Sequence, residues 1–189
     1  MTKVQRSLRF IEWRRIKRET MGILIFGIIL LAGYIWFLNH QQNRAERYFA
    51  NLKMSAPQQY LNEIKGVAGY NFYLREYRRI NGYDRLKSKA PDFLLGRWSI
   101  ASTAKRVSAS YTTPECLNPL LIENGRITLP NTAGPINGVS YKLVANDLVV
   151  ALPDSKKLEI GLVSTGILLH HLELKFPGQL KTSFGYSCR

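Results

Sequence analysis

The sequence predicts an α+β protein, in which a single N-terminal transmembrane helix with a helical stalk precedes a C-terminal antiparallel β-barrel or sandwich of about seven or eight strands. Three observations predict this fold. Residues 21–38 carry no charge, residues 39–90 show helical spacing, and residues 91–189 show short alternating runs separated by turns. The 189 residues therefore divide into a basic cytoplasmic segment (1–20), the span (21–38), an exported stalk region (39–90) and an exported β domain (91–189).

The span reads MGILIFGIILLAGYIWFL. At about 1.5 Å per helical residue it covers about 27 Å, close to the hydrocarbon thickness of a bilayer. Tyr34 and Trp36 near its end suit the membrane interface. A cleaved signal peptide is the competing interpretation, but residues 34–38 offer no small side chain for cleavage. An uncleaved anchor is therefore expected.

The distribution of positive charge predicts the orientation. Residues 1–20 contain seven basic side chains, whereas the 20 residues after the span, 39–58, contain three. The positive-inside rule keeps the N-terminus in the cytoplasm and exports the rest. The exported part has no Asn-x-Ser/Thr glycosylation site, which favours a bacterial inner membrane and a periplasmic C-terminal domain.

The stalk region contains three helical patterns. Residues 39–52 can continue the membrane helix outward, and Pro57 then breaks the pattern and begins a second helix that reaches Ile64. A third helix runs from about Gly69 to Asn81-Gly82, a common stop signal.

This third helix carries a mixed basic and aromatic stretch. Residues 39–189 contain 20 basic and 11 acidic side chains, a net charge of +9, so an anionic partner is a reasonable expectation. Export makes nucleic acid an unlikely partner and leaves a lipid, an anionic polysaccharide or an acidic envelope protein. The alternative is a basic amphipathic helix whose tyrosines pack inward. The candidate partner face consists of Tyr70, Tyr73, Arg75, Tyr77, Arg78 and Arg79.

The β domain is predicted from side chains that alternate between apolar and polar. The alternation covers Val107 to Tyr111, Val139 to Leu143, Leu158 to Leu162, Leu168 to Phe176 and Leu180 to Tyr186. Turn residues separate the runs, at Asn124-Gly125, Asn146-Asp147, Pro153-Asp154, Thr165-Gly166 and Pro177-Gly178. Half-buried strands at this spacing are typical of an antiparallel barrel or sandwich.

One stretch resembles a known family. Leu95-Gly96-Arg97-Trp98 at the start of the first strand is similar to the Gly-x-Trp opening of small bacterial lipocalin-like domains. Residues 141–150 are similar to a central hairpin in them, and the resemblance extends over residues 95–186. It implies a meandering barrel in which Gly96 allows a tight passage and Trp98 plugs one end. It also implies an apolar ligand.

Cys116 and Cys188 both lie in the exported part, where oxidation is permitted, so we expect them to form a disulfide. His170 and His171 are adjacent on a predicted strand. Neighbouring strand residues face opposite sides, so the pair is not expected to bind a metal jointly. The sequence has no phosphate-binding loop, metalloprotease motif, nucleophile elbow or CxxC pair. We therefore expect no cofactor and a protein that is not an enzyme.

Two functions fit these features. The first is a non-catalytic accessory or scaffold subunit of a bacterial envelope assembly that acts through its exported β domain. Its layout is similar to that of type IV pilin subunits, although their Gly-Phe-Thr-Leu-x-Glu processing motif is absent here. The second is a lipocalin-like binding module for a lipid or another apolar small molecule. A deep apolar cavity would favour the second, and a filled barrel with an exposed apolar patch the first.

Overall fold

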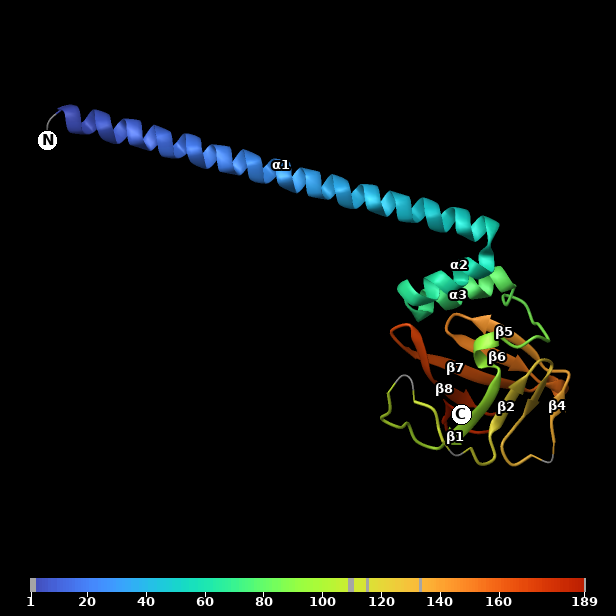
Figure 1. The fold of residues 1–189 in the computed structure, drawn as a ribbon. Coiled ribbons are helices and arrows are strands. Elements are labelled where there is room, and N and C mark those ends of the chain that lie inside the picture. The colour runs from blue at the N-terminus through green and yellow to red at the C-terminus, as the bar shows by residue number, and fades with distance from the viewer. Residues whose placement is uncertain (1–2, 109–110, 115, 133, 189) are drawn as a thin grey trace. The chain divides into compact units, whose positions relative to one another are not determined.

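The computed structural model describes residues 3–108, 111–114, 116–132 and 134–188, and the side chains from Met21 onward within those ranges. The chain forms two compact units, Met1–Ser55 and Ala56–Arg189. The first contains the single helix α1 (Lys3–Ser55), and the second contains α2, α3 and all the strands (Figure 1).

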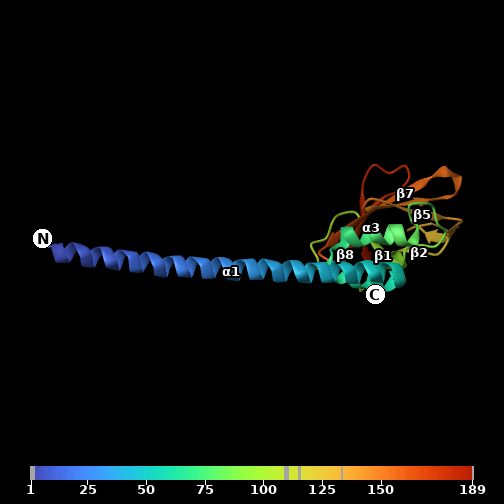
Figure 2. The ribbon, with the colours of Figure 1, turned by 90° about the horizontal axis from the view of Figure 1, so that it is seen from above.

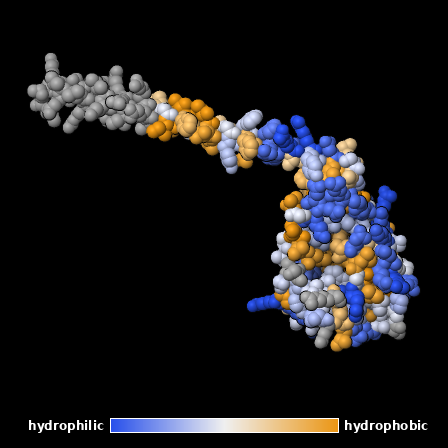
Figure 3. All heavy atoms as spheres, viewed as in Figure 1, coloured by the Kyte–Doolittle hydropathy of each residue, from blue (hydrophilic) through white to orange (hydrophobic). Residues whose placement is uncertain are grey.

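Helix α1 is long and apolar enough, in the described part from Met21 onward, to cross a membrane by length and composition. Its most apolar window has a mean hydropathy of 2.4, and none of that window is buried. The apolar stretch of α1 is the orange segment in Figure 3. The predicted N-terminal apolar helix is therefore present, and the predicted stalk continues it without a break as far as Ser55.

Helices α2 (Pro57–Val67) and α3 (Tyr70–Asn81) form an antiparallel pair. Pro57 occupies the first turn of α2, where its missing N–H costs nothing. Helix α3 ends at Gly82, which adopts a left-handed conformation with φ of 68° and closes the last turn onto Arg78 O. The pair lies above the strands in the view of Figure 1, and α3 overlies part of the sheet when seen from above in Figure 2.

The strands form one nine-stranded antiparallel sheet curled into a half-barrel. Its order is β4-β3-β2-β1-β9-β8-β7-β6-β5. The strands are β1 (Gly96–Ala101), β2 (Leu120–Glu123), β3 (Arg126–Thr128), β4 (Ile136–Asn137), β5 (Ser140–Val144), β6 (Asp147–Ala151), β7 (Lys157–Thr165), β8 (Leu168–Lys175) and β9 (Ser183–Ser187).

The two edge strands of this sheet, β4 and β5, are consecutive in the chain. Only Gly138 and Val139 separate them, and Gly138 has a φ of 73° that favours glycine. The continuous segment 136–144 therefore pairs with β3 through β4 and with β6 through β5. The sheet therefore has nine strands where seven or eight were expected.

Residues 83–90 fill the gap between β5 and the β2–β3 hairpin. Lys87 pairs with Tyr141 through two backbone hydrogen bonds of 3.0 and 2.7 Å. Leu143 N donates to Tyr83 O at 2.9 Å, and Gly125 N donates to Ser88 O at 2.6 Å. This segment satisfies backbone groups that an open sheet edge would otherwise leave unpaired.

The Tyr141 hydroxyl crosses the same gap. It donates to one of two carbonyls on the β2–β3 hairpin, Glu123 O at 2.7 Å and Arg126 O at 3.1 Å. Burial, and then the Glu123 carboxylate, raise the pKa of Tyr141 to about 12, so the hydroxyl keeps its proton.

Replacing Tyr141 with phenylalanine is expected to lower the free energy of unfolding by about 1–2 kcal/mol, because the carbonyls of Glu123 and Arg126 lose the hydroxyl that they share. Tyr70→Phe is the matched control. The Tyr70 hydroxyl is buried with no hydrogen-bond partner among the described residues, so its removal should be neutral or stabilising. Urea unfolding of the two variants checks this. Equal effects would contradict the bridging role of Tyr141.

The interior of the half-barrel is filled with side chains. Its largest fully buried members from the strands are Tyr141, Tyr186, Leu120, Ile122, Ile127, Leu143, Leu148, Leu158 and Ile160. They come from six of the nine strands (β2, β3, β5, β6, β7 and β9) and alternate with more exposed neighbours, as a one-sided sheet requires.

One predicted strand is wrong. The alternation of Val107 and Tyr111 suggested a strand, but residues 102–108 and 111–112 form none; Ala109 and Ser110 lie outside the described residues. Strand β1 already pairs with β2 on one side and β9 on the other, so no edge is available there. Thr113 makes only a single bridge to Cys188.

Candidate functional site

The half-barrel has two ends with different character. At one end, which we call the helix end, Tyr70 N of α3 donates to Gly166 O in the β7–β8 turn at 3.2 Å. Strands β7 and β8 lead from there to the opposite end, which we call the loop end, at residues 152–156 and 176–183. Each end carries an open groove.

The loop-end groove has a volume of about 470 Å³. Ile100 from β1, Ile136 from β4 and Phe176 after β8 contribute apolar surface to it, as do Leu129 and Leu152. Its polar lining consists of Asn131, Thr132, Lys156, Gln179 and Ser183. Apolar surface with a few polar groups is the usual composition of a binding site for a small molecule or a peptide segment.

The loop between β8 and β9 contributes to this groove and also exposes a large apolar side chain. Pro177 and Gln179 line the groove, and Leu180, the next residue, is fully exposed. Sequence reasoning treated Pro177-Gly178 only as a turn. The signal that could have identified the site is the pair of bulky apolar residues, Phe176 and Leu180, on either side of that turn.

At the helix end, the structure separates the predicted basic and aromatic face into two parts. Tyr70, Tyr73 and Tyr77 are buried and pack around Phe93, with ring centroids 5.2–6.2 Å from it. Burial raises the pKa of all three hydroxyls. The tyrosines therefore belong to the core, as the amphipathic alternative requires.

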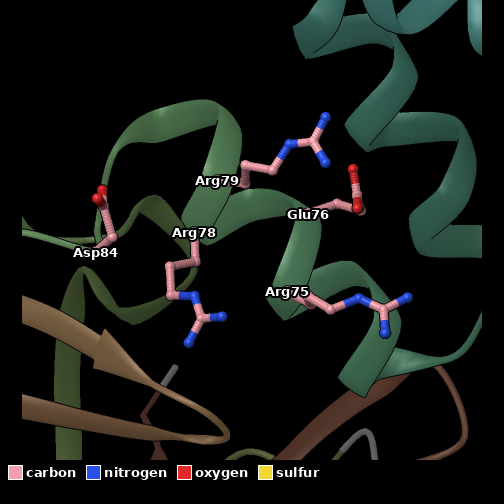
Figure 4. Close-up of a pocket in the computed structure, with 5 residues that line it drawn as sticks. All are labelled: Arg75, Glu76, Arg78, Arg79 and Asp84. Atoms are coloured by element: carbon pink, nitrogen blue, oxygen red, sulfur yellow. The ribbon is translucent and has the colours of Figure 1, made fainter.

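The arginines of the same helix lie on its outer side. Arg75, Arg78 and Arg79 line an open groove together with Glu76 and Asp84 (Figure 4). Hydrophilic residues gather over this helix pair on the surface (Figure 3).

Trp98 is buried in β1, opposite Ser187 of β9 and Leu120 of β2. Its indole N–H donates to Leu94 O at 2.9 Å. This acceptor belongs to the short helix η1 (Asp92–Leu94), four residues before Trp98 in the chain, and not to the closing strand β9. Gly96 has a φ of 126°, and no atom lies within 4 Å of a Cβ built there. Its requirement for glycine is therefore conformational rather than steric.

The predicted disulfide between Cys116 and Cys188 is confirmed, with Cα atoms 6.0 Å apart. It lies at the helix end, where Cys188 N donates to Arg97 O and an Arg97 guanidinium N–H donates to Cys116 O. A disulfide fits an extracytoplasmic domain.

The expectation that His170 and His171 face opposite sides is wrong. The register of β7 and β8 shifts between Val163, opposite His171, and Ser164, opposite Leu169. His170 is thus the extra residue of a β-bulge, and the two imidazoles meet with their Nδ1 atoms 2.6 Å apart. The described residues nevertheless include no group of three or more side chains able to hold a metal ion.

Hydrogen bonding determines the protonation of this pair. Nε2 of His170 lies 2.8 Å from Val107 O and must donate, because a carbonyl only accepts. In neutral His170, Nδ1 is then an acceptor, so Nδ1 of His171 donates to it. Nε2 of His171 is left without a proton, buried and without a hydrogen-bond partner among the described residues, 3.9 Å from the Glu173 carboxylate.

Acid is expected to destabilise the domain through His171. Burial, and then the neighbouring His170, lower the pKa of His171, while Glu173 raises it. Phe184 and Tyr186 also pack on its ring. The folded domain therefore binds a proton at His171 less readily than the unfolded chain does. Protonation favours the unfolded chain, so the free energy of unfolding decreases as the pH falls below about 6.5, the ordinary pKa of histidine.

Comparing urea midpoints at about pH 7.5 and about pH 5 tests this expectation. His171→Phe should reduce the loss of stability on acidification, since it removes the titrating group. Glu173→Gln should increase that loss, since it removes the charge that favours protonation. A loss unchanged in both variants would assign the acid sensitivity to other groups.

Comparison with known proteins adds no family to this description. No protein family, no curated protein and no solved structure matches the chain.

Proposed function

We propose that this protein is a membrane-anchored accessory or scaffold subunit of a bacterial envelope assembly, which acts by binding rather than by catalysis. Its N-terminus lies in the cytoplasm, and its exported domain docks a partner protein in the loop-end groove. The apolar helix and the disulfide support the location. The observation that carries the proposal is an apolar groove open to solvent above a filled interior, with Leu180 exposed beside it.

The composition of the groove suits a protein partner. The apolar side chains of Ile100, Ile136 and Phe176 can receive an apolar anchor residue, and the polar groups of Thr132 and Gln179 can bond to the surrounding backbone. This is the arrangement of an interface core with a polar rim. Pro130 and Pro177 restrict the loops that build the groove, which reduces the entropy lost on binding.

Photo-crosslinking in intact cells tests the proposal. A photoreactive residue at position 180 should capture a specific protein in the full-length chain. The matched control is position 117, where Leu117 is also strongly exposed but lies beside the disulfide at the other end of the half-barrel. Leu180→Asp should abolish co-purification of the captured protein and Leu117→Asp should not. Equal capture at both positions would refute docking at the loop end.

The second candidate is the lipocalin-like function, binding of a lipid or another apolar small molecule. The volume of about 470 Å³ and the apolar lining favour it, since small-molecule sites occupy about 300–1,000 Å³. The filled interior leaves the groove as the place for such a ligand. Solvent extraction of the purified chain followed by mass spectrometry should then find one apolar molecule per chain, lost in Ile136→Glu. This result without capture at position 180 would replace the first function by the second.

The proposed topology gives a separate prediction. A periplasm-dependent reporter fused after Arg189 should be active, because the 20 residues before the span contain seven basic side chains and the 20 residues after it contain three. Replacing the basic residues before the span with glutamine should reduce that activity. A reporter active only in the cytoplasm would contradict the proposed location of the domain.

A further inference from the structure

The positive charge of the exported domain is concentrated in one short segment. Residues 56–189 contain 17 basic and 10 acidic side chains, a net charge of +7. Residues 65–89 alone contain seven basic and two acidic side chains, a net charge of +5. This segment comprises α3 and the chain on either side of it.

Three arginines of this segment share a groove. Arg78 and Arg79 lie three and four positions after Arg75 on α3. With Glu76 and Asp84, the three arginines line an open groove of about 600 Å³ (Figure 4). Within the described residues, no ion pair engages any of the three guanidinium groups. Their charge is therefore available to a ligand.

The backbone that carries these arginines is held firmly. Buried Tyr73, Leu74 and Tyr77 attach α3 to the core. The Tyr77 hydroxyl accepts a hydrogen bond from Asp92 N at 3.2 Å. The Arg75 guanidinium carbon also lies 4.8 Å from the centre of the Phe72 ring, which positions the charged group. A fixed helix presents its charges at little entropic cost on binding.

We propose that this groove binds an acidic segment of a partner protein through its carboxylates. A guanidinium group forms bidentate hydrogen bonds with a carboxylate. Three arginines on one helix can therefore bind several acidic side chains of one segment. Glu76 and Asp84 place negative charge in the same groove. They repel a uniform polyanion such as an acidic polysaccharide or a layer of lipid phosphates, whereas a peptide can present neutral or basic side chains to them.

This inference extends beyond the proposed function, because the arginine groove and the loop-end groove lie at opposite ends of the half-barrel. The test uses synthetic probes, so its outcome does not depend on whether Leu180 captures a partner.

The probe is a fluorescent peptide in which glutamate alternates with alanine, titrated onto the full-length chain in neutral detergent. Arg75→Glu combined with Arg79→Glu should weaken binding at least about tenfold, because each reversal turns attraction into repulsion. The matched control is Arg106→Glu combined with Lys157→Glu, which changes the net charge equally at two exposed sites that do not line the arginine groove and should leave binding within about twofold. Arg75→Lys combined with Arg79→Lys should weaken binding measurably, since lysine keeps the charge but loses the planar fork.

Several outcomes would overturn the proposal. If the two double charge reversals weakened peptide binding equally, the peptide would be attracted by the net charge alone. If the variant with lysine at positions 75 and 79 bound the peptide as tightly as the wild type, the bidentate guanidinium bonds would have no role. Undiminished binding of the same peptide with glutamine in place of glutamate would exclude carboxylate recognition. Tighter groove-dependent binding of phosphatidylglycerol vesicles or alginate than of the peptide would assign the groove to a lipid or a polysaccharide. Circular dichroism melting of each variant ensures that only folded protein is compared.

Discussion

Replacing Cys116 and Cys188 with serine is expected to lower the free energy of unfolding of the domain formed by Ala56–Arg189 by about 4 kcal/mol. The disulfide joins residues 72 positions apart, and in the chain-entropy description a loop of that size restricts the unfolded chain by about this amount. This is a large part of the 5–15 kcal/mol typical of a folded domain. Urea unfolding of the oxidised chain and the double variant measures the difference.

The disulfide ties the chain between β1 and β2 to the residue that follows β9. This chain forms no regular strand in its described part. Hydrogen bonds also hold it, from Thr113 N to Ser187 O at 2.8 Å, from Lys105 N to the Tyr186 hydroxyl at 2.6 Å and from His170 Nε2 to Val107 O at 2.8 Å. Reduced wild-type protein should unfold at the same urea concentration as the serine variant. If reduction left the urea midpoint unchanged, the disulfide would not stabilise the domain. It would then give weaker support to the proposed location outside the cytoplasm.

Trp98→Ala is expected to cost about 3–5 kcal/mol, the usual range for removing a large buried aromatic side chain. Trp98 is 6% exposed, and its indole N–H bonds to Leu94 O. The variant loses the apolar contacts inside the half-barrel and also leaves that carbonyl without its donor. A domain of ordinary stability would become marginal or unfold.

Two further variants separate the contributions of Trp98. Trp98→Phe retains most of the packing and should cost about 1–3 kcal/mol through the lost hydrogen bond and the smaller ring. Trp36→Ala removes an indole that is 68% exposed on α1 and should leave the unfolding of the domain formed by Ala56–Arg189 unchanged. A Trp98→Ala variant with unchanged unfolding would contradict the plug that the lipocalin-like resemblance implies.

The candidate sites were only partly predictable from the sequence. The helical spacing of Arg75, Arg78 and Arg79 places them on one side of a helix, but only the packing of α3 decides that the arginines face solvent while the tyrosines enter the core. The loop-end groove was not predicted. Residues from β1, β4, β9 and three loops build it, and their convergence depends on how the sheet curls.

Local patterns in the sequence determined the elements whose signals lie within a few residues. Pro57 and Gly82 mark where helices begin and end, because proline lacks an N–H and glycine tolerates a left-handed backbone. Alternation likewise identified β5, β7, β8 and β9, because one face of each strand must be buried. The tertiary structure decided the features that require a distant partner. The β-bulge at His170 depends on the register against β7, the lost strand near Val107 depends on the occupied edges of β1, and the closure by residues 83–90 depends on the gap between β5 and the β2–β3 hairpin. Periodicity is a property of neighbouring residues, whereas pairing and register are set by the free energy of contacts between segments far apart in the chain.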